Sequence, residues 1–246
     1  MKQYRDDAIV LRTQKLGEAD RIVTALTRDH GCVRAVAKGV RKTNSRFGAR
    51  LEPFTHVDVV LHHGRNLDTV TQVEVRDAFG TQLAQDYARY TAGGAMVEAA
   101  ARLTDHEQEP APDQFVLLLG ALRSLARGEH AAGLTLDAYL LRAVAIAGYS
   151  PALDSCARCA ATDSLVGFAA AVGGVVCASC RPPGSQPVTP AAIAVMTALL
   201  HADWATADAA DEELQREVSM LTGAFAQYHL EAGLRSLRVI AQERPR

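Results

Sequence analysis

The sequence lacks long apolar runs and has few aromatic side chains. A membrane-spanning helix needs a run of roughly 18 uninterrupted apolar residues, and the 246-residue sequence contains no such run. The first ten residues, MKQYRDDAIV, carry acids where a signal peptide would have its apolar segment. We therefore expect a cytoplasmic protein with no membrane partner.

Motifs for nucleotide binding and covalent catalysis are also missing. The chain has no G-x-x-x-x-G-K-[ST], no G-x-G-x-x-G and no G-x-S-x-G. Its eight histidines are scattered, and the adjacent pair His62 and His63 would point to opposite faces of a strand. We therefore predict no catalytic residues and a function that is not enzymatic.

Cysteine is scarce, but four of the five cysteines form two Cys-x-x-Cys pairs within residues 156–180. Pairs with this spacing in a reducing compartment are typical of a zinc ribbon or knuckle. Four thiolates close the coordination sphere, which indicates a structural metal rather than a catalytic one. A redox-active pair of dithiols is the alternative, and Cys32 is expected to be a small core residue. The predicted Zn²⁺ ligands are Cys156, Cys159, Cys177 and Cys180.

Acidic residues are absent from His30 to Leu51. Residues 1–80 carry 14 Lys and Arg against 10 Asp and Glu, whereas residues 81–246 carry 12 against 18. Such asymmetry indicates an anionic partner for the basic part. Arg34 and Lys38 are separated by an even number of residues, so they are expected on one face of their strand. The predicted nucleic-acid-binding residues are Arg34, Lys38, Arg41, Lys42 and Arg46.

Aromatic residues near these cations are too few for extensive base stacking. Phe54 and Phe79 are expected in the core, so Phe47 alone is placed to stack on a base. We therefore predict binding dominated by phosphate contacts, which accepts single- and double-stranded DNA and weakens steeply with salt.

The hydrophobic period changes near residue 80. Segments 31–40, 56–64 and 68–77 alternate as strands do, and five short strands fit a closed OB-type barrel over residues 1–80, with an SH3-like barrel fitting nearly as well. Segments 83–103, 113–128, 134–149, 189–203 and 211–242 show helical periodicity. The predicted fold is α+β and multidomain, with a helical domain over residues 81–246 and a zinc-binding insertion at about 153–183.

Two stretches resemble the bacterial RecO family of recombination mediators. They are AIVLRTQKLGEADRIVTALTRDHGCVRAVAKGVRKTNSRFGARLEPFTHVDVVL and YLLRAVAIAGYSPALDSCARC. The resemblance implies an N-terminal OB fold, a helical domain with an embedded zinc site, DNA binding and strand annealing. It also implies partnership with RecR in loading RecA onto DNA coated by single-strand binding protein (SSB), whose acidic tail the helical domain holds.

The resemblance also implies roles for individual residues. Lys38, Arg41 and Lys42 match DNA-contacting positions of the family's barrel, and the four clustered cysteines match its zinc ligands. Arg142 is our choice for the residue that binds the carboxylate of the SSB tail.

The sequence therefore favours a non-enzymatic mediator of recombinational DNA repair in the cytoplasm, associated with the nucleoid. A zinc-ribbon transcription regulator, a metal-dependent nuclease and a protein-binding scaffold are the alternatives. The regulator would need a basic recognition helix, which the sequence does not show, and the nuclease would need a cluster of acids.

Overall fold

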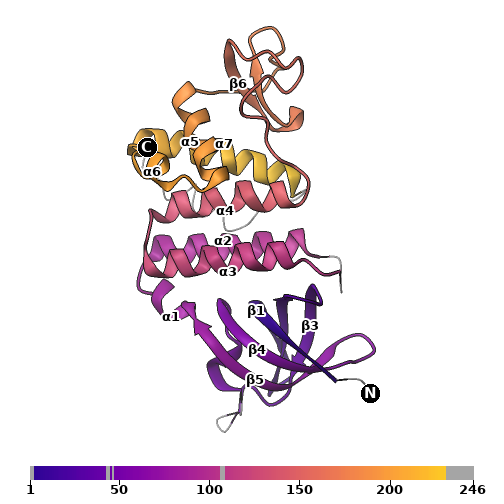
Figure 1. Ribbon diagram of the computed structural model, residues 1–246. Helices are drawn as coiled ribbons and strands as arrows, with labels where there is room; N and C mark the ends of the chain where they lie inside the picture. The colour runs from indigo at the N-terminus through magenta and orange to yellow at the C-terminus, as the bar shows by residue number, and fades with distance from the viewer. Residues whose placement is uncertain (1–2, 43–44, 46, 106–108, 231–246) are drawn as a thin grey trace. The chain divides into compact units, whose positions relative to one another are not determined.

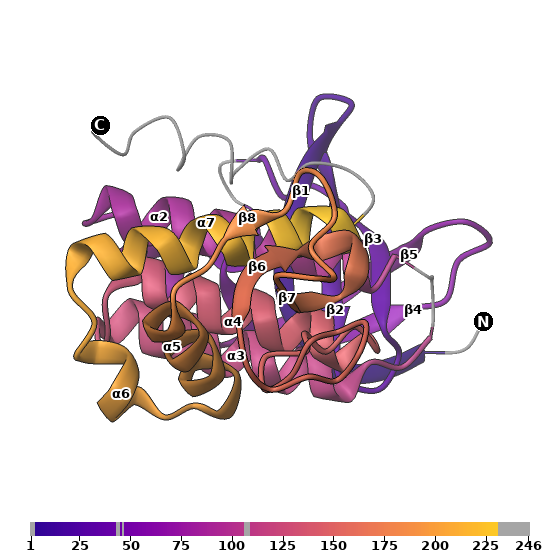
Figure 2. The same ribbon diagram turned by 90° about the horizontal axis from the view of Figure 1, so that it is seen from above.

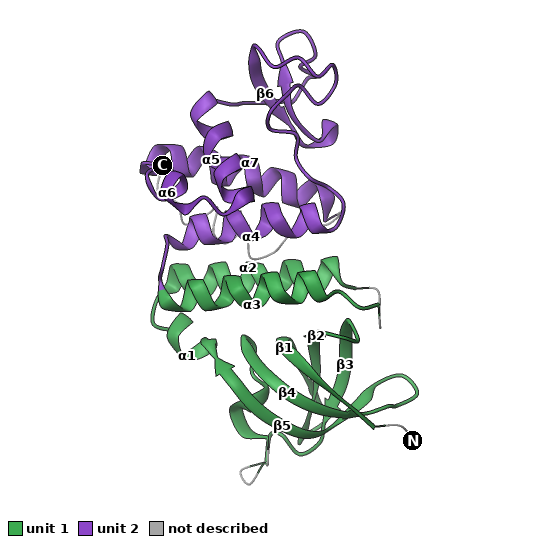
Figure 3. Ribbon diagram, viewed as in Figure 1, with its two compact units in different colours: residues 1–127 green, residues 128–246 purple. Residues whose placement is uncertain are grey.

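The computed structural model describes residues 3–42, 45, 47–105 and 109–230. These residues form two compact units, residues 1–127 and 128–246 (Figure 3). The first unit therefore extends beyond the last strand of the barrel and includes three helices. The boundary predicted at residue 80 marks the change from strands to helices, and the compact units divide later in the chain.

Five strands of the first unit close into a barrel (Figure 1). The strand order is β1-β2-β3-β5-β4, in which β3 pairs parallel with β5 and the other neighbours are antiparallel. This is the predicted OB-type barrel, and closure leaves no exposed sheet edge. The strands are β1 (Gln3–Leu16), β2 (Asp20–Thr27), β3 (Cys32–Ala37), β4 (Thr55–His62) and β5 (Asp68–Ala78).

Alternating apolar residues of all five strands fill the interior of the barrel. Val33 and Ala35 of β3 lie in this core, with Val10, Val23 and Val57 from neighbouring strands. A short 3-10 helix, η1 (Gly48–Leu51), follows the loop after β3, and its Leu51 joins the same core.

Three helices complete the first unit because part of the outer barrel surface is apolar. These are α1 (Phe79–Leu83), α2 (Tyr87–Leu103) and α3 (Pro112–Arg127), and α2 begins at the N-cap Asp86. Ile9, Leu26 and Cys32 form a cross-strand row opposite the barrel core, and all three are buried. Helix α2 contacts β1 and α3 contacts β2. Burial of Cys32 confirms that the fifth cysteine is a core residue.

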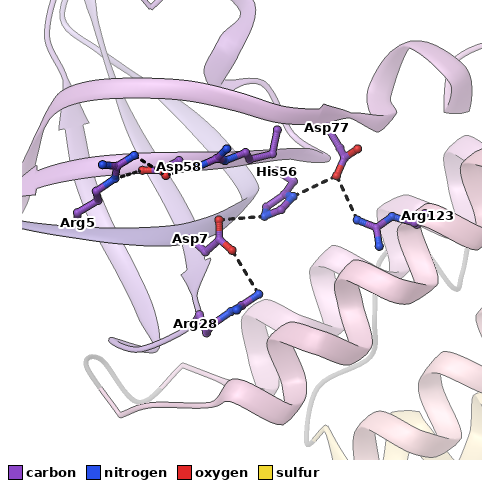
Figure 4. A network of polar contacts seen from close by, with 8 residues as sticks. Arg5, Asp7, Arg28, His56, Asp58, Asp77 and Arg123 are labelled. Carbon is purple, nitrogen blue, oxygen red and sulfur yellow. Dashed lines mark hydrogen bonds and ion pairs between the residues drawn. The ribbon is translucent and has the colours of Figure 1, made fainter.

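A network of charged side chains also joins the barrel to α3 (Figure 4). His56 lies between Asp7 and Asp77, at 3.2 Å from each carboxylate. Arg28 pairs with Asp7, and Arg123 of α3 pairs with Asp77, each at 3.2 Å. Burial alone would raise the pKa of Asp77, but its hydrogen bonds with His56 and Arg123 outweigh burial and lower that pKa. The carboxylates of this network therefore neutralise the cations beside them.

The second unit is a helical core with a small sheet. Helices α4 (Ala132–Ile146), α5 (Pro190–His201) and α7 (Glu212–His229) pack against one another, and α6 (Trp204–Asp208) joins α5 to α7. Thr189 caps α5 by accepting a hydrogen bond from the Ala192 N–H at 3.1 Å, with Pro190 at the first helical position. The predicted final helix is confirmed up to His229, Leu230 is its C-cap, and residues 231–242 of the prediction lie outside the described residues.

The small sheet lies between α4 and α5 in the sequence. It consists of β6 (Leu165–Ala169), β7 (Gly174–Cys177) and β8 (Gln186–Pro187), with β6 in the centre, and η2 (Ala170–Val172) joins β6 to β7. Figure 2 shows β8 beside the hairpin of β6 and β7. This hairpin lies within the predicted zinc-binding insertion and ends at Cys177. No helix in the described ranges is long and apolar enough to cross a membrane.

Candidate nucleic-acid interface and metal centre

The open part of the outer barrel surface carries exposed cations. Arg34 is exposed between Val33 and Ala35, which both face the barrel core. It lies in one cross-strand row with Thr24 of β2 and Arg12 of β1, beside the row that the helices cover. The two arginines are two strand spacings apart, or about 10 Å. They can therefore face the same extended ligand.

Arg12 was not predicted as a nucleic-acid-binding residue, because its outward direction depends on a β-bulge in β1. The pairing of β1 with β2 slips between Val10 and Arg12, where an extra residue enters β1. A bulge reverses which face the following residues point to. Strict alternation from the outward-facing Ile9 would have turned Arg12 into the barrel. Its Nε instead lies 3.5 Å from Thr24 Oγ1 on the outer surface.

Three further cations lie in the turn after β3. Lys38, Arg41 and Lys42 are all exposed. The prediction that Lys38 shares a strand face with Arg34 was wrong, because β3 ends at Ala37. Gly39 adopts a φ of 67° in the turn, and its N–H donates to Asp20 Oδ1 at 2.7 Å. This left-handed conformation suits glycine and ends the strand.

The turn is fixed against the β1–β2 connection. Arg41 Nη1 donates to the Gly17 carbonyl at 3.2 Å, and the Arg41 N–H donates to the Ala19 carbonyl at 3.0 Å. We call Arg12, Arg34, Lys38, Arg41 and Lys42 the basic surface. Arg46, also predicted to bind nucleic acid, lies outside the described residues.

No described carboxylate neutralises the cations of the turn. Within the described residues, Lys38, Arg41 and Lys42 form no ion pair with a carboxylate. Elsewhere on the barrel, Arg5 and Arg76 both bind Asp58, and their hydrogen bonds lower the pKa of Asp58 to about 2. The positive charge of the turn is therefore available to an anionic ligand, whereas the charge of Arg5 and Arg76 is not.

Phe47 is buried, contrary to the prediction that it can stack on a base. It is only 5% exposed and belongs to the barrel core together with Val40 and Leu51. The residue predicted to stack on a base therefore packs inside the protein. Phe54 and Phe79 are buried, as predicted.

We expect Phe47→Leu to lower stability without changing DNA binding by the folded protein. Loss of buried aromatic volume should cost about 1–2 kcal/mol of unfolding free energy. Urea unfolding would measure this loss, and fluorescence anisotropy with a labelled oligonucleotide would measure affinity. Reduced affinity at unchanged stability would show that Phe47 contacts a base after all.

The four clustered cysteines meet at one point of the second unit. The sulfurs of Cys156, Cys159, Cys177 and Cys180 all lie within 4.8 Å of one another. Those of Cys159 and Cys177 are 3.8 Å apart. A tetrahedral zinc with zinc–sulfur distances of about 2.3 Å places its sulfurs about 3.8 Å apart. The donor set therefore fits a metal ion.

The backbone holds these cysteines in position. The Cys180 N–H donates to the Cys177 carbonyl at 3.1 Å, and the Cys156 N–H donates to the Ala161 carbonyl at 2.8 Å. Ala152 pairs with Gly174 of β7, and a Cβ at Gly174 would lie 2.2 Å from the Ala152 carbonyl oxygen. Only glycine permits this approach, which attaches the chain before Cys156 to the hairpin that ends at Cys177.

Electrostatics at the cluster favour a cation. Backbone N–H groups of Cys177, Arg158 and Cys159 lower the pKa of Cys156 to about 6, so this thiolate forms near neutral pH. Hydrogen bonds with the sulfurs of Cys159 and Cys177 raise the pKa of Cys180 to about 12. The negative charge of one thiolate therefore suppresses ionisation of another thiol. A bound cation would relieve the repulsion between the thiolates. In the described part of the chain, no other group of three His, Cys, Asp or Glu residues is placed to hold a metal.

Arg142 lies on α4 and is partly exposed. It has no ion pair or hydrogen bond within the described residues. Ile146 follows one helical turn later and is 44% exposed, and Tyr149 beyond the helix is 50% exposed. Tyr149 stacks on His229 of α7 with ring centroids 4.6 Å apart. A cation thus lies beside exposed apolar groups.

Comparison with known proteins gives consistent matches along the chain. The family described as "Recombination protein O N terminal" matches residues 1–79, and "Recombination protein O C terminal" matches residues 84–238. The "DNA repair protein RecO" of Thermobifida fusca is 58% identical over 240 residues, covering 98% of this chain and 99% of that protein. Those of Streptomyces coelicolor and Streptomyces griseus are 56% and 55% identical over 246 residues, with the same coverage.

Proposed function

Because this chain belongs to the RecO family of DNA repair proteins, we propose that it is a DNA-binding mediator of recombinational repair that catalyses no covalent reaction. It anneals complementary strands and, with RecR, helps to load RecA onto single-stranded DNA coated by SSB. It works in the cytoplasm at the nucleoid.

One observation carries the proposal: exposed cations that have no carboxylate partner among the described residues gather at one end of β3. Lys38, Arg41 and Lys42 supply this charge, and Arg34 and Arg12 extend it across the outer barrel surface. Buried Phe47 leaves the basic surface without an aromatic side chain of its own. Phosphate recognition without base recognition suits a protein that must act on any sequence.

Strand annealing follows from this electrostatic binding. Two complementary strands are polyanions, and their repulsion slows their encounter. A surface that neutralises phosphates on both strands lowers that repulsion and concentrates the strands. The direct test is the annealing rate of complementary oligonucleotides over a salt series. Annealing that is no faster with the protein than without it would reject the proposal.

Zinc at the four-cysteine site has a structural role in this proposal. Cys156, Cys159, Cys177 and Cys180 would hold it, and four thiolates leave no open position for substrate. The ion would fix the hairpin of β6 and β7 to the segment that leaves α4. The ion would therefore stabilise the second unit.

The SSB tail is proposed to bind beside Arg142. An acidic peptide with an apolar tip requires a cation next to apolar surface, and Arg142 and Ile146 provide both on one helix face. Holding the tail while the barrel captures neighbouring DNA raises the local DNA concentration. Displacement of SSB then requires no nucleotide hydrolysis.

We expect Arg142→Ala to weaken binding of a synthetic SSB tail peptide at least tenfold. Loss of a charge-assisted hydrogen bond costs about 1.5–3 kcal/mol, and about 1.4 kcal/mol corresponds to a factor of ten. Isothermal titration calorimetry would measure the change, and Arg216→Ala on α7 provides an exposed control in the same unit. Equal losses in the two variants would place the tail elsewhere.

A further inference from the structure

A polar pocket lies beside β3, away from the turn that carries Lys38. Its volume is about 370 Å³. It lies where the β4–β5 loop passes the first residues of β3, and β3 and β5 pair there through Ala35 and Asp68. We call it the β4–β5 pocket; it is lined by Cys32, Val33, Arg34, Gly64, Arg65, Asn66 and Asp68.

The loop that forms the pocket has a defined shape. A Cβ at Gly64 would lie 1.8 Å from the Leu67 carbonyl oxygen, so the loop closes too tightly for any other residue. The Gly64 N–H donates to Asp68 Oδ1 at 3.0 Å, which fixes the start of the loop to the start of β5. Arg65 and Asn66 are thereby held at the exposed tip.

Asp68, the one carboxylate among the described residues that line the pocket, already has hydrogen-bond partners in the protein. Tyr4 donates its hydroxyl hydrogen to Asp68 Oδ2 at 2.5 Å, and His63 Nδ1 lies 3.4 Å from Asp68 Oδ1. Burial raises the pKa of Tyr4, with Asp68 adding to the effect, so the hydroxyl remains a donor. Asp68 is itself buried.

The exposed groups of the pocket include several donors. Arg65 forms no ion pair or hydrogen bond with a described residue. Its guanidinium and the Asn66 amide both offer N–H groups, and Arg34 lines the same pocket. A cavity lined by two guanidinium groups and an amide suits a phosphate oxygen better than a base edge or an apolar group.

The geometry points to the β4–β5 pocket as a second phosphate site, in which Arg65, Asn66 and Arg34 hold a phosphodiester group of the same DNA strand that binds the basic surface. The inference rests on the proposed function. β3 spans five residue steps, or about 17 Å. The strand therefore runs along β3, from the turn at Lys38 to the β4–β5 loop, and Arg65 contacts it at the far end.

Arg65→Ala tests this path. For a single-stranded oligonucleotide of about 16 nucleotides, we expect three- to tenfold weaker binding and a log–log salt slope that is less steep by about 0.7. For an oligonucleotide of about 4 nucleotides, which is too short to contact the cations of the turn and Arg65 at the same time, we expect little change. Arg65→Lys should keep the salt slope, because it keeps the charge. Arg89→Ala on α2 removes a partly exposed arginine outside the pocket and should change neither value.

Three outcomes separate this inference from the proposed function. If Arg65→Ala and Asn66→Ala bind both oligonucleotides like the wild type while changes at Lys38, Arg41 and Lys42 weaken binding, the second site is wrong and the proposed function stands. If the wild type binds no DNA, the proposed function is rejected, and the inference that rests on it is rejected too. If inorganic phosphate binds in an Arg65-dependent way but Arg65→Ala leaves DNA affinity unchanged, the pocket takes a free anion and the path along β3 is rejected.

Discussion

Replacing Lys38, Arg41 and Lys42 together by alanine should remove most DNA binding and strand annealing. Each cation that contacts a phosphate contributes about 0.9 to the log–log salt slope on duplex DNA, so the slope should become less steep by about 3. At low salt we expect the affinity to fall on the order of 100-fold. All three side chains are exposed, and the triple change removes one exposed hydrogen bond, from Arg41 to the Gly17 carbonyl, so the free energy of unfolding should fall by no more than about 1 kcal/mol. Fluorescence anisotropy and an annealing assay over the same salt series would measure both effects.

Two controls make this experiment specific. Lys38→Arg with Lys42→Arg keeps every charge and should retain binding, because phosphate contacts need charge more than a particular side chain. Arg89→Ala with Arg216→Ala removes a partly exposed cation of the first unit and an exposed cation of the second, and it should leave the slope unchanged. A triple variant that binds and anneals like the wild type would mean that DNA uses another surface.

Among the substitutions proposed, Cys156→Ser should lower the stability of the second unit most. Structural zinc contributes on the order of 10 kcal/mol to the folding of small zinc-finger peptides, and three thiolates hold the ion less tightly than four. We expect one zinc per wild-type chain by elemental analysis and loss of most of that metal in the variant. Limited proteolysis should then cleave within residues 150–187, where the hairpin and the cysteine turns depend on the cluster.

The fifth cysteine provides the matched control for this change. Cys32→Ala removes a sulfur from the first unit and should leave the metal content unchanged. DNA binding by the barrel should survive Cys156→Ser, because the basic surface belongs to the first unit. Normal stability of Cys156→Ser, or full metal content in it, would contradict a structural role for the ion.

Local patterns in the chain were sufficient for the elements and the metal ligands. Strand alternation predicted β3, β4 and β5, and helical periodicity predicted α2, α3, α4 and α5. Two Cys-x-x-Cys pairs predicted the cluster because each pair forms its own turn, and the cluster needs only that the two turns meet. Short helices such as α1 and α6 were missed, since five residues are too few to show a period.

The cations were harder to place, because side-chain direction depends on neighbouring strands. The acid-free segment indicated Lys38, Arg41 and Lys42 correctly as exposed cations, but Lys38 lies in a turn and not on the strand face of Arg34. Phe47 follows a polar loop in the sequence, yet it folds back into the barrel core. Nothing local shows whether such a side chain will find apolar partners.

The sequence by itself determined the fold class, the four-cysteine set and the sign of the charge near β3, because periodicity, spacing and composition are properties of the chain. Only the tertiary structure decided which surface those charges share. The bulge in β1 turns Arg12 outward, and the parallel pairing of β3 with β5 brings Arg65 to Arg34 across 31 residues of sequence. Register and closure of a barrel arise from pairing between distant strands, so the outer surface exists only after the chain has folded.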